Sequence, residues 1–255
     1  MKTGLLIIFV FIVFHINLLA QDIPELITDR PDQTESAAIV PQGWLQVETG
    51  FTFDRTTHES IYENISINEY AIAGTLLRYG LSSSFELRTG GGYFKTDADP
   101  IFNHSGFGEF FIGTKYLFPV KEIDFAILAH LNLPIGENAY SPEKFEPEII
   151  FSLSKDLSKN ISAGINFGGQ WNSFIEETTY LYSAAIGIGL NEKFGSFAEI
   201  YGVIIRGVDP IYKFDTGITY LASENFQLDA STGINLNGND TNWLISGGVS
   251  FRISD

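Results

Sequence analysis

The sequence predicts an all-β fold, a single antiparallel up-and-down transmembrane β-barrel of about twelve strands. Three observations support this prediction. The chain begins with an export-type segment, and its later segments alternate between apolar and small polar residues with a period of two. The connections between these segments are alternately short and long, as in outer-membrane barrels.

The first twenty residues have the features of a secretory signal peptide. Lys2 precedes an apolar run over residues 5–20, which is too short and too close to the N-terminus for a membrane-spanning helix. We expect cleavage after Ala20 and export to the outer membrane of a Gram-negative cell. The predicted organisation is a signal peptide (1–20), a periplasmic or lumen-entering segment (21–43) and a barrel (44–255).

The composition excludes several classes of protein. A formal net charge of −16 argues against nucleic acid as a partner, and a cysteine count of zero excludes disulfides, thiol nucleophiles and cysteine-based metal sites. We expect neither a cofactor nor a metal. Charged residues make up 18% of the chain, whereas soluble domains have about 25%. The partners we expect are outer-membrane lipid, the barrel-assembly machinery and a small solute of unknown identity.

The last segment, residues 242–253, shows the alternation most clearly. Its odd positions are apolar apart from Gly247, whereas Ser246, Gly248 and Ser250 occupy even positions. A soluble β-sandwich also alternates, but its solvated face would carry more Lys and Glu. Small polar residues instead suit a crowded barrel interior, and segments of this length exceed the five or six residues of an average soluble strand.

Twelve segments of this kind follow one another along the chain. They cover residues 44–54, 67–80, 85–95, 106–118, 123–133, 146–156, 160–171, 179–190, 194–205, 211–221, 225–236 and 242–253. Connections after even-numbered segments are tight, and most of those after odd-numbered segments are longer. We therefore expect periplasmic turns on one rim, extracellular loops on the other and both termini in the periplasm.

Aromatic residues gather near both ends of the predicted strands, as bilayer interfaces favour. Near the outer rim these are Tyr93, Trp171, Tyr180, Tyr212 and Trp243, and near the inner rim Trp44, Tyr79, Tyr116, Phe118, Tyr220 and Phe251.

A motif ahead of the first strand carries a resemblance to a known family. Residues 28–36 read TDRPDQTES and residues 40–50 read VPQGWLQVETG; further matches are LLRYGL (76–81), FELR (85–88), GTKY (113–116), LPIG (133–136), EPE (146–148) and GVSFR (248–252). The chain resembles the family of outer-membrane transporters named for the meta-cleavage pathway of phenol degradation. The resemblance implies an outer-membrane barrel with a transport function, without specifying a substrate.

Ten charged or titratable residues are predicted to line the lumen, because a charge facing lipid near the midplane costs about 2–4 kcal/mol for Arg or Lys. They are Glu48, Glu86, Arg88, Glu109, Lys115, His130, Glu148, Asp215, Asp229 and Arg252. They could form a selectivity lining or a network of internal salt bridges that closes the barrel. The segment 67–80 has no cleanly polar face, so the direction of Arg78 is left open, with a position at the membrane interface as one alternative.

The sequence gives no coherent catalytic set, and we expect the protein not to be an enzyme. His58 and His104 fall in predicted external loops, whereas His130 faces the lumen. We therefore predict a passive channel or transporter for small solutes, with hydrophobic or aromatic solutes as one class. The alternatives are a structural or adhesive barrel with a closed lumen and, less favoured, an outer-membrane hydrolase.

The polar segment before the first strand is the candidate plug. It consists of Asp29, Arg30, Pro31, Asp32, Gln33, Thr34 and Glu35. Residues 36–43 can span up to about 26 Å when extended, enough for the segment to fold back into the periplasmic half of the barrel. We expect Arg30 to pair with a lumen carboxylate such as Glu48 or Glu86. The alternative is an ordered periplasmic tail that aids delivery to the assembly machinery.

Overall fold

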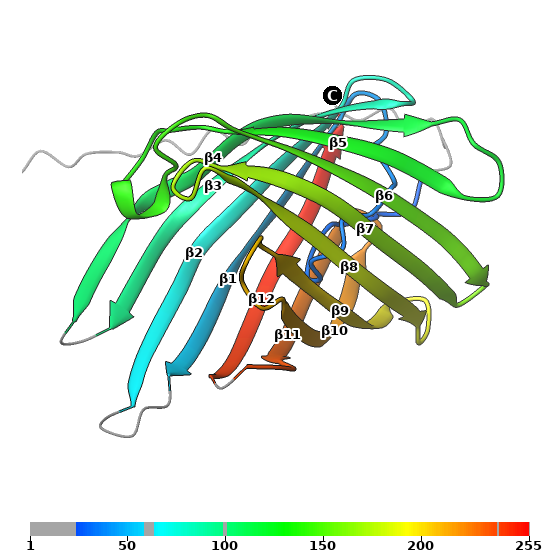
Figure 1. The fold of residues 1–255 in the computed structure, drawn as a ribbon. Coiled ribbons are helices and arrows are strands. Elements are labelled where there is room, and N and C mark those ends of the chain that lie inside the picture. Colours follow the sequence, from blue (N-terminus) through cyan, green and yellow to red (C-terminus); the bar gives the residue numbers. More distant parts are fainter. Residues whose placement is uncertain (1–23, 59–63, 99–100, 239, 255) are drawn as a thin grey trace, which may run out of the picture.

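The protein is a closed antiparallel barrel of twelve strands (Figure 1). A computed structural model describes residues 24–58, 64–98, 101–238 and 240–254. The predicted signal peptide lies outside the described residues. The strands are β1 (Trp44–His58), β2 (Ile65–Gly80), β3 (Phe85–Ala98), β4 (Phe102–Phe118), β5 (Asp124–Asn132), β6 (Glu146–Ser158), β7 (Ile161–Asn172), β8 (Glu177–Gly189), β9 (Phe194–Ile204), β10 (Ile211–Ser223), β11 (Phe226–Asn235) and β12 (Thr241–Ser254).

Each strand pairs with its neighbour in sequence, and β1 pairs with β12 to close the barrel. This order confirms the predicted fold class and the strand count. β1 to β4 reach further into the outer loops than predicted, and β1 extends as far as His58, whose ring pairs with Asp240 at 2.8 Å. A single 3-10 turn, η1 (Asn138–Tyr140), follows β5. Among the described residues, no helix is long and apolar enough to cross a bilayer.

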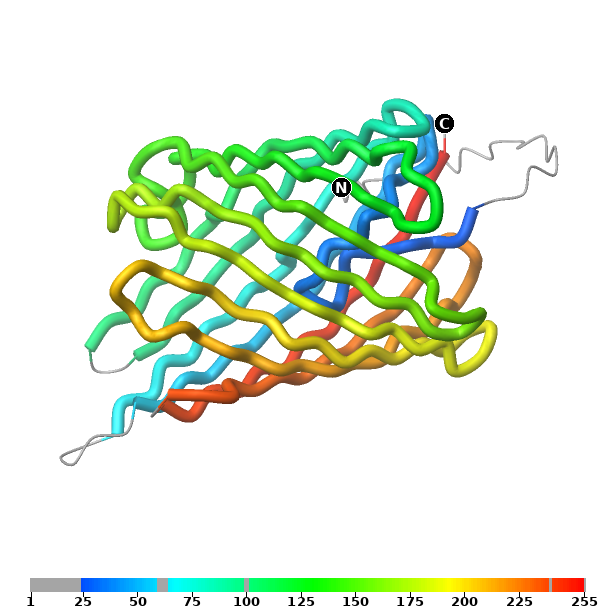
Figure 2. Tube along the Cα trace, turned by 45° about the vertical axis from the view of Figure 1, so that its right-hand side comes forward, coloured from blue at the N-terminus to red at the C-terminus, as the bar shows by residue number. Residues whose placement is uncertain are grey.

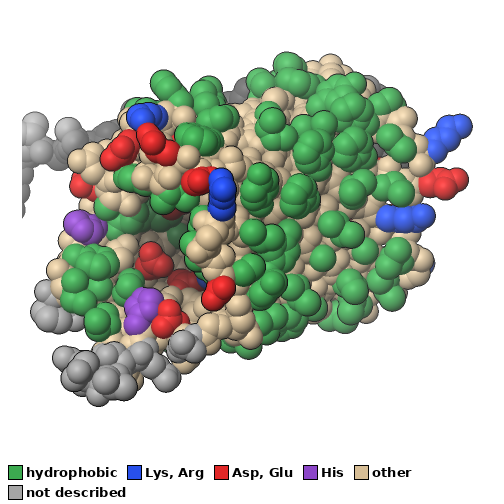
Figure 3. Space-filling view, in the orientation of Figure 1, with side chains coloured by type: hydrophobic (Ala, Val, Ile, Leu, Met, Phe, Trp, Pro, Cys, Tyr) green, Lys and Arg blue, Asp and Glu red, His purple; other side chains and the backbone are tan. Residues whose placement is uncertain are grey.

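The alternation of each strand separates a lipid-facing surface from a lumen-facing one. On β11, Leu228 and Ile234 face outward and are 40% and 49% exposed, whereas Gln227 and Asp229 between the outward positions are buried. Apolar side chains cover the middle of the barrel wall, and charged ones gather at its two ends (Figure 3). This surface is that of a protein immersed in lipid.

Bulges in β2 and β4 explain why the sequence did not show which alternating positions of these strands face the lumen. The register of β2 against β3 shifts between Ile72 and Thr75, and Ala73 has a φ of 54°. An extra residue reverses which positions face inward. Arg78, on the far side of this bulge, is therefore fully buried in the lumen. This burial rules out the alternative of a position at the membrane interface.

Candidate functional site

The chain ahead of β1 lies inside the barrel rather than below it (Figure 2). We call residues 24–43 the luminal segment. Leu26, Asp29, Thr34, Ala37 and Val40 within it are all at least nine-tenths buried. The segment returns to the rim beside β2, where Gly43 donates its amide to the carbonyl of Gly80. It is therefore a hairpin-like insertion whose tip, at residues 31–33, lies in the lumen.

One wall of the lumen is basic and binds the acidic side chains of the luminal segment. Arg78 on β2, Arg88 on β3 and Lys115 on β4 contact the carboxylate of Asp29 at 3.0, 2.8 and 3.3 Å. Arg88 also donates to both carboxylate oxygens of Glu35, at 2.9 and 2.8 Å. All three cations are fully shielded from solvent. Buried charges are tolerated only when they are paired in this way.

The three cations of this wall and burial together set the pKa values of Asp29 and Glu35. Burial raises the pKa of Asp29, but Arg78, Lys115 and Arg88 outweigh it and hold that pKa well below its ordinary value. For Glu35, burial exceeds the effect of Arg88 and raises the pKa to about 7. Asp29 is therefore ionised at neutral pH, whereas Glu35 titrates close to it.

Acidic side chains of β1 and β11 bind the luminal segment around Arg30. Arg30 donates to the two carboxylate oxygens of Asp229 on β11, at 2.9 and 3.3 Å. Glu48 accepts hydrogen bonds from the backbone amides of Asp29 and Arg30 at 2.9 and 3.0 Å. Arg30 therefore pairs with a lumen carboxylate, as predicted, but this carboxylate is Asp229 and neither of the two named examples, Glu48 and Glu86. The Arg30 side chain extends across to β11, and Glu48 binds the backbone.

Other strands bind the backbone of the luminal segment near its tip. Glu199 on β9 accepts from the Gln33 amide at 2.7 Å and from the hydroxyl of Thr34. Asn166 on β7 accepts from the Glu35 amide at 2.6 Å and donates to the Glu35 carbonyl at 2.9 Å. Strands on all sides of the lumen thus satisfy backbone groups that a buried loop would otherwise leave unpaired.

The luminal segment lies between two cavities. The outer one, of about 740 Å³, is lined by Gln33, Glu35 and the inward side chains of β2 to β7. The inner one, of about 600 Å³, is lined by residues 25–28 and 30–32 and by β6 to β11. Arg30 lines both cavities. The segment therefore forms the partition between these two cavities of the lumen.

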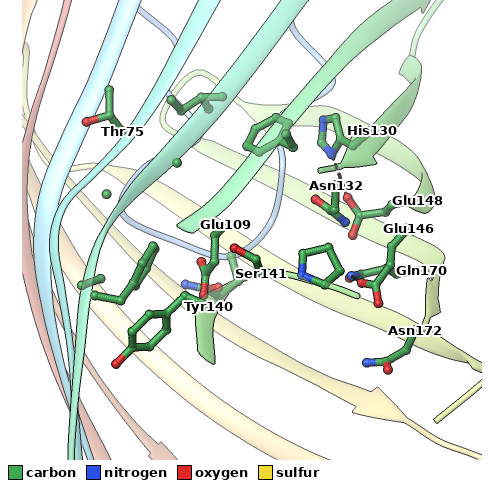
Figure 4. A pocket seen from close by; sticks show the side chains of 18 of the residues that line it. Thr75, Glu109, His130, Asn132, Tyr140, Ser141, Glu146, Glu148, Gln170 and Asn172 are labelled. Carbon is green, nitrogen blue, oxygen red and sulfur yellow. Dashed lines mark hydrogen bonds and ion pairs between the residues drawn. The ribbon is translucent and has the colours of Figure 1, made fainter. Parts of the chain in front are cut away.

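The outer cavity is rich in carboxylates and amides (Figure 4). Glu109, Glu146 and Glu148 line it, with Gln170 and Asn172 beside them. His130 lies on its wall and shares a 2.7 Å hydrogen bond with Glu148. Glu109 sits at the β4 bulge with a φ of 53°, which directs its side chain into the cavity. η1 folds over the mouth, and its Tyr140 also lines the cavity.

A third cavity, of about 340 Å³, opens beside the tip of the segment. Leu181, Tyr201, Val203 and Ile211 supply largely apolar walls, and Gln33 of the luminal segment lines both this cavity and the outer one.

The side chains of all ten residues predicted to line the lumen lie inside the barrel, although a selectivity role for them remains a prediction. Glu48, Glu86, Arg88, Lys115 and Asp229 touch the luminal segment or its immediate partners, and Glu109, His130 and Glu148 line the outer cavity. Asp215 is buried opposite Glu199, and Arg252, near the end of β12, donates to backbone carbonyls of the luminal segment.

Sequence reasoning missed Arg78, Glu146 and Glu199. The bulge in β2 concealed Arg78. Glu199 has Phe197 and Tyr201 as its same-face neighbours, so no small residues marked that face as luminal. The signal that could have identified Glu199 as luminal is a charged residue in the middle of a membrane strand, where a charge facing lipid is unfavourable.

Comparison with known proteins identifies the family of this chain. The family described as "Putative MetA-pathway of phenol degradation" matches residues 28–253. The chain belongs to this family. The match includes residues 29–35, so the luminal tip is part of the family's shared region along with the strands.

Solved structures share the barrel fold. An outer-membrane channel from Pseudomonas putida F1 is 11% identical, with a TM-score of 0.63, over 85% of this chain and 97% of that chain. The NanC porin is 11% identical, with a TM-score of 0.52, over 81% of this chain and 98% of that chain. At this level of identity the likeness shows the fold alone. A comparison with curated protein sequences gave no match.

Proposed function

We propose that the protein is a passive outer-membrane channel for small solutes and that residues 29–35 act as its internal plug. The observation that carries this proposal is the pair of cavities with the luminal segment between them. The plug residues are bound mainly through side chains of the wall. A rearrangement of these contacts would join the two cavities without opening the barrel.

The cavities also support a class of solute. The outer cavity offers carboxylates, amides and aromatic rings, whereas the cavity beside Gln33 is mostly apolar. A small molecule with one polar group and one hydrophobic or aromatic part would find partners in both. Such a solute would reach the plug tip from the extracellular side.

Planar-bilayer conductance tests the proposal. Deletion of residues 22–36 should raise the single-channel conductance, because the partition between the cavities is removed. Heat-modifiable gel migration must first show that the shortened barrel is assembled. Conductance equal to that of the full chain, in an assembled barrel, would leave the segment with a delivery role only.

A structural or adhesive barrel is the second candidate, favoured by the buried ion pairs that hold the plug. If this is correct, neither the full chain nor the deletion variant will conduct. Catalysis is not part of the proposal, because His130 faces the lumen and is paired with Glu148. Hydrolysis of ester or phospholipid substrates by detergent-solubilised protein would contradict that view.

The apolar belt and the barrel fold support insertion in an outer membrane. We infer that residues 1–20 direct export to the outer membrane of a Gram-negative cell. Recovery of the protein as a soluble periplasmic species would contradict this.

A further inference from the structure

The first half of the luminal segment runs along the line where the barrel closes. β1 and β12 are the first and last strands, and their pairing from Trp44↔Ser254 to Thr57↔Thr241 closes the sheet. We call this pairing the seam and residues 24–30 the inbound leg. The inbound leg forms hydrogen bonds to strands on both sides of the seam.

On the β1 side, the contacts are to residues close in sequence. Gln46 donates its side-chain amide to the carbonyl of Ile27 at 2.9 Å. Glu48 accepts from the amides of Asp29 and Arg30. These bonds link residues only 18 or 19 positions apart, so they can form as soon as β1 has taken its strand conformation.

On the other side, the contacts are to the last two strands. Arg252 on β12 donates to the carbonyls of Pro24 and Glu25, and Gln227 on β11 donates to the Thr28 hydroxyl at 2.9 Å. Arg30 donates to Asp229 on β11 at 2.9 Å, across 199 residues of sequence, and to Ser246 on β12 at 3.2 Å.

The side chain of Arg30 lies directly on the seam. Gly50 of β1 and Gly248 of β12 are paired across it. A Cβ atom at Gly50 would lie 2.5 Å from the guanidinium carbon, and one at Gly248 would also collide with this group. The two glycines thus form a slot that exists only when β1 and β12 are together.

The outbound leg, residues 34–40, provides an internal comparison. Its contacts are to β2, β3, β4, β6, β7, β8 and β9, for example from Ser152 to the Glu35 carbonyl at 2.6 Å and from the Val40 amide to Glu86 at 2.8 Å. None of these strands borders the seam. Both legs contact β2 to β4, the inbound leg through the Asp29 carboxylate, but only the inbound leg also binds the strands on both sides of the seam.

We infer that the inbound leg is an internal staple for barrel closure. Bound first to β1, it presents Arg30 and two backbone carbonyls to β11 and β12 when these strands arrive. Pairing β1 with β12, which are far apart in the chain, has an entropic cost that must be met before their contacts form. The inbound leg adds hydrogen bonds to β11 and β12 at this step and so favours closure. This role is independent of the proposed plug function, since it would operate in a barrel that never conducts.

Refolding of the full chain from urea into phosphatidylcholine vesicles, followed by heat-modifiable gel migration, tests the inference. Arg30→Ala and Asp229→Ala should each slow closure about tenfold, the rate ratio of roughly 1.4 kcal/mol, and the double variant should be no slower than either. The matched control is Ser152→Ala, which removes a contact of the outbound leg and should close at close to the wild-type rate. Closure of R30A at the wild-type rate, or equal slowing by S152A, would overturn the inference.

A disulfide bond across the seam provides the second test. It also covers the case in which R30A does not fold. The chain has no cysteine, so Thr57→Cys and Thr241→Cys, which are paired at the outer end of the seam, can be oxidised without competing thiols. This disulfide should restore the closure yield of R30A, or of the milder Gln227→Ala. Yields that stay low with the disulfide formed would show that Arg30 acts elsewhere than at the seam.

Discussion

Gly50 and Gly248 are paired across the β1–β12 seam, and the guanidinium of Arg30 fills the space where their side chains would be. Glycine is required here by a close approach between the wall and the luminal segment. Conformational freedom is not the reason, because neither residue has a positive φ.

Gly248→Ala should therefore destabilise the barrel. The added methyl group collides with Arg30, and overpacking of this kind costs about 1–3 kcal/mol. Urea unfolding in detergent micelles, followed by gel migration, measures this loss. Gly247→Ala is the matched control, because a Cβ there would have its nearest contact at an ordinary 3.5 Å. Equal stability of G248A and G247A would show that Arg30 leaves the slot freely.

Asp29 and Asp32, three residues apart, should respond in opposite ways to loss of charge. Asp29→Asn leaves three buried cations without their shared carboxylate, and breaking a buried pair costs about 3–5 kcal/mol. Burial, together with Glu199, holds the pKa of Asp32 well above its ordinary value, so Asp32→Asn removes an unfavourable charge. Protection of the segment from protease, compared between the variants, checks both. Equal loss of protection in the two variants would contradict the view that the charge of Asp29 stabilises the docked segment and that of Asp32 does not.

Docking of the plug should weaken as the pH rises through about 7. Glu35 has a pKa near 7 when docked and an ordinary value of 4.5 when released, so the docked state holds the extra proton between these values. Stability that depends on a raised carboxyl pKa is lost as the pH rises through it. The fraction of open channels should increase between about pH 4.5 and pH 7 and level off above this range.

Glu35→Gln should flatten this pH dependence, because glutamine stays neutral throughout. Asp32 acts in the same direction, because its pKa is also raised, so a residual slope in E35Q should disappear in the double variant with Asp32→Asn. An unaltered slope in the double variant would place the titrating group elsewhere.

The outer cavity should favour cations over anions. Glu109, Glu146 and Glu148 line it, and Glu109 has no ion-pair partner among the described residues. Glu109→Gln should lower the ratio of potassium to chloride permeability by several-fold, measured as the reversal potential in a KCl gradient with the plug deleted. Lys121→Gln, in a periplasmic turn, is the control. A reversal potential unchanged in E109Q would remove the selectivity role of this carboxylate.

The sequence by itself determined the strands, their order and their lipid face. A period of two over ten or more residues is a local property, and the bilayer accepts only one face of such a strand, so segments such as 226–235 could be placed to within a residue or two. The inward direction of Glu48, Glu86 and Lys115 followed from the same parity.

Only the tertiary structure decided what the inward residues contact. Arg30 binds Asp229, 199 residues away, because closure pairs β1 with β12 and so brings β11 to within one strand of β1. Arg78 turned inward because one extra residue in β2 reversed its parity. Period and spacing act along a strand, whereas pairing across the lumen depends on which strands face each other around a closed barrel. The partners of the luminal segment are fixed by that closure.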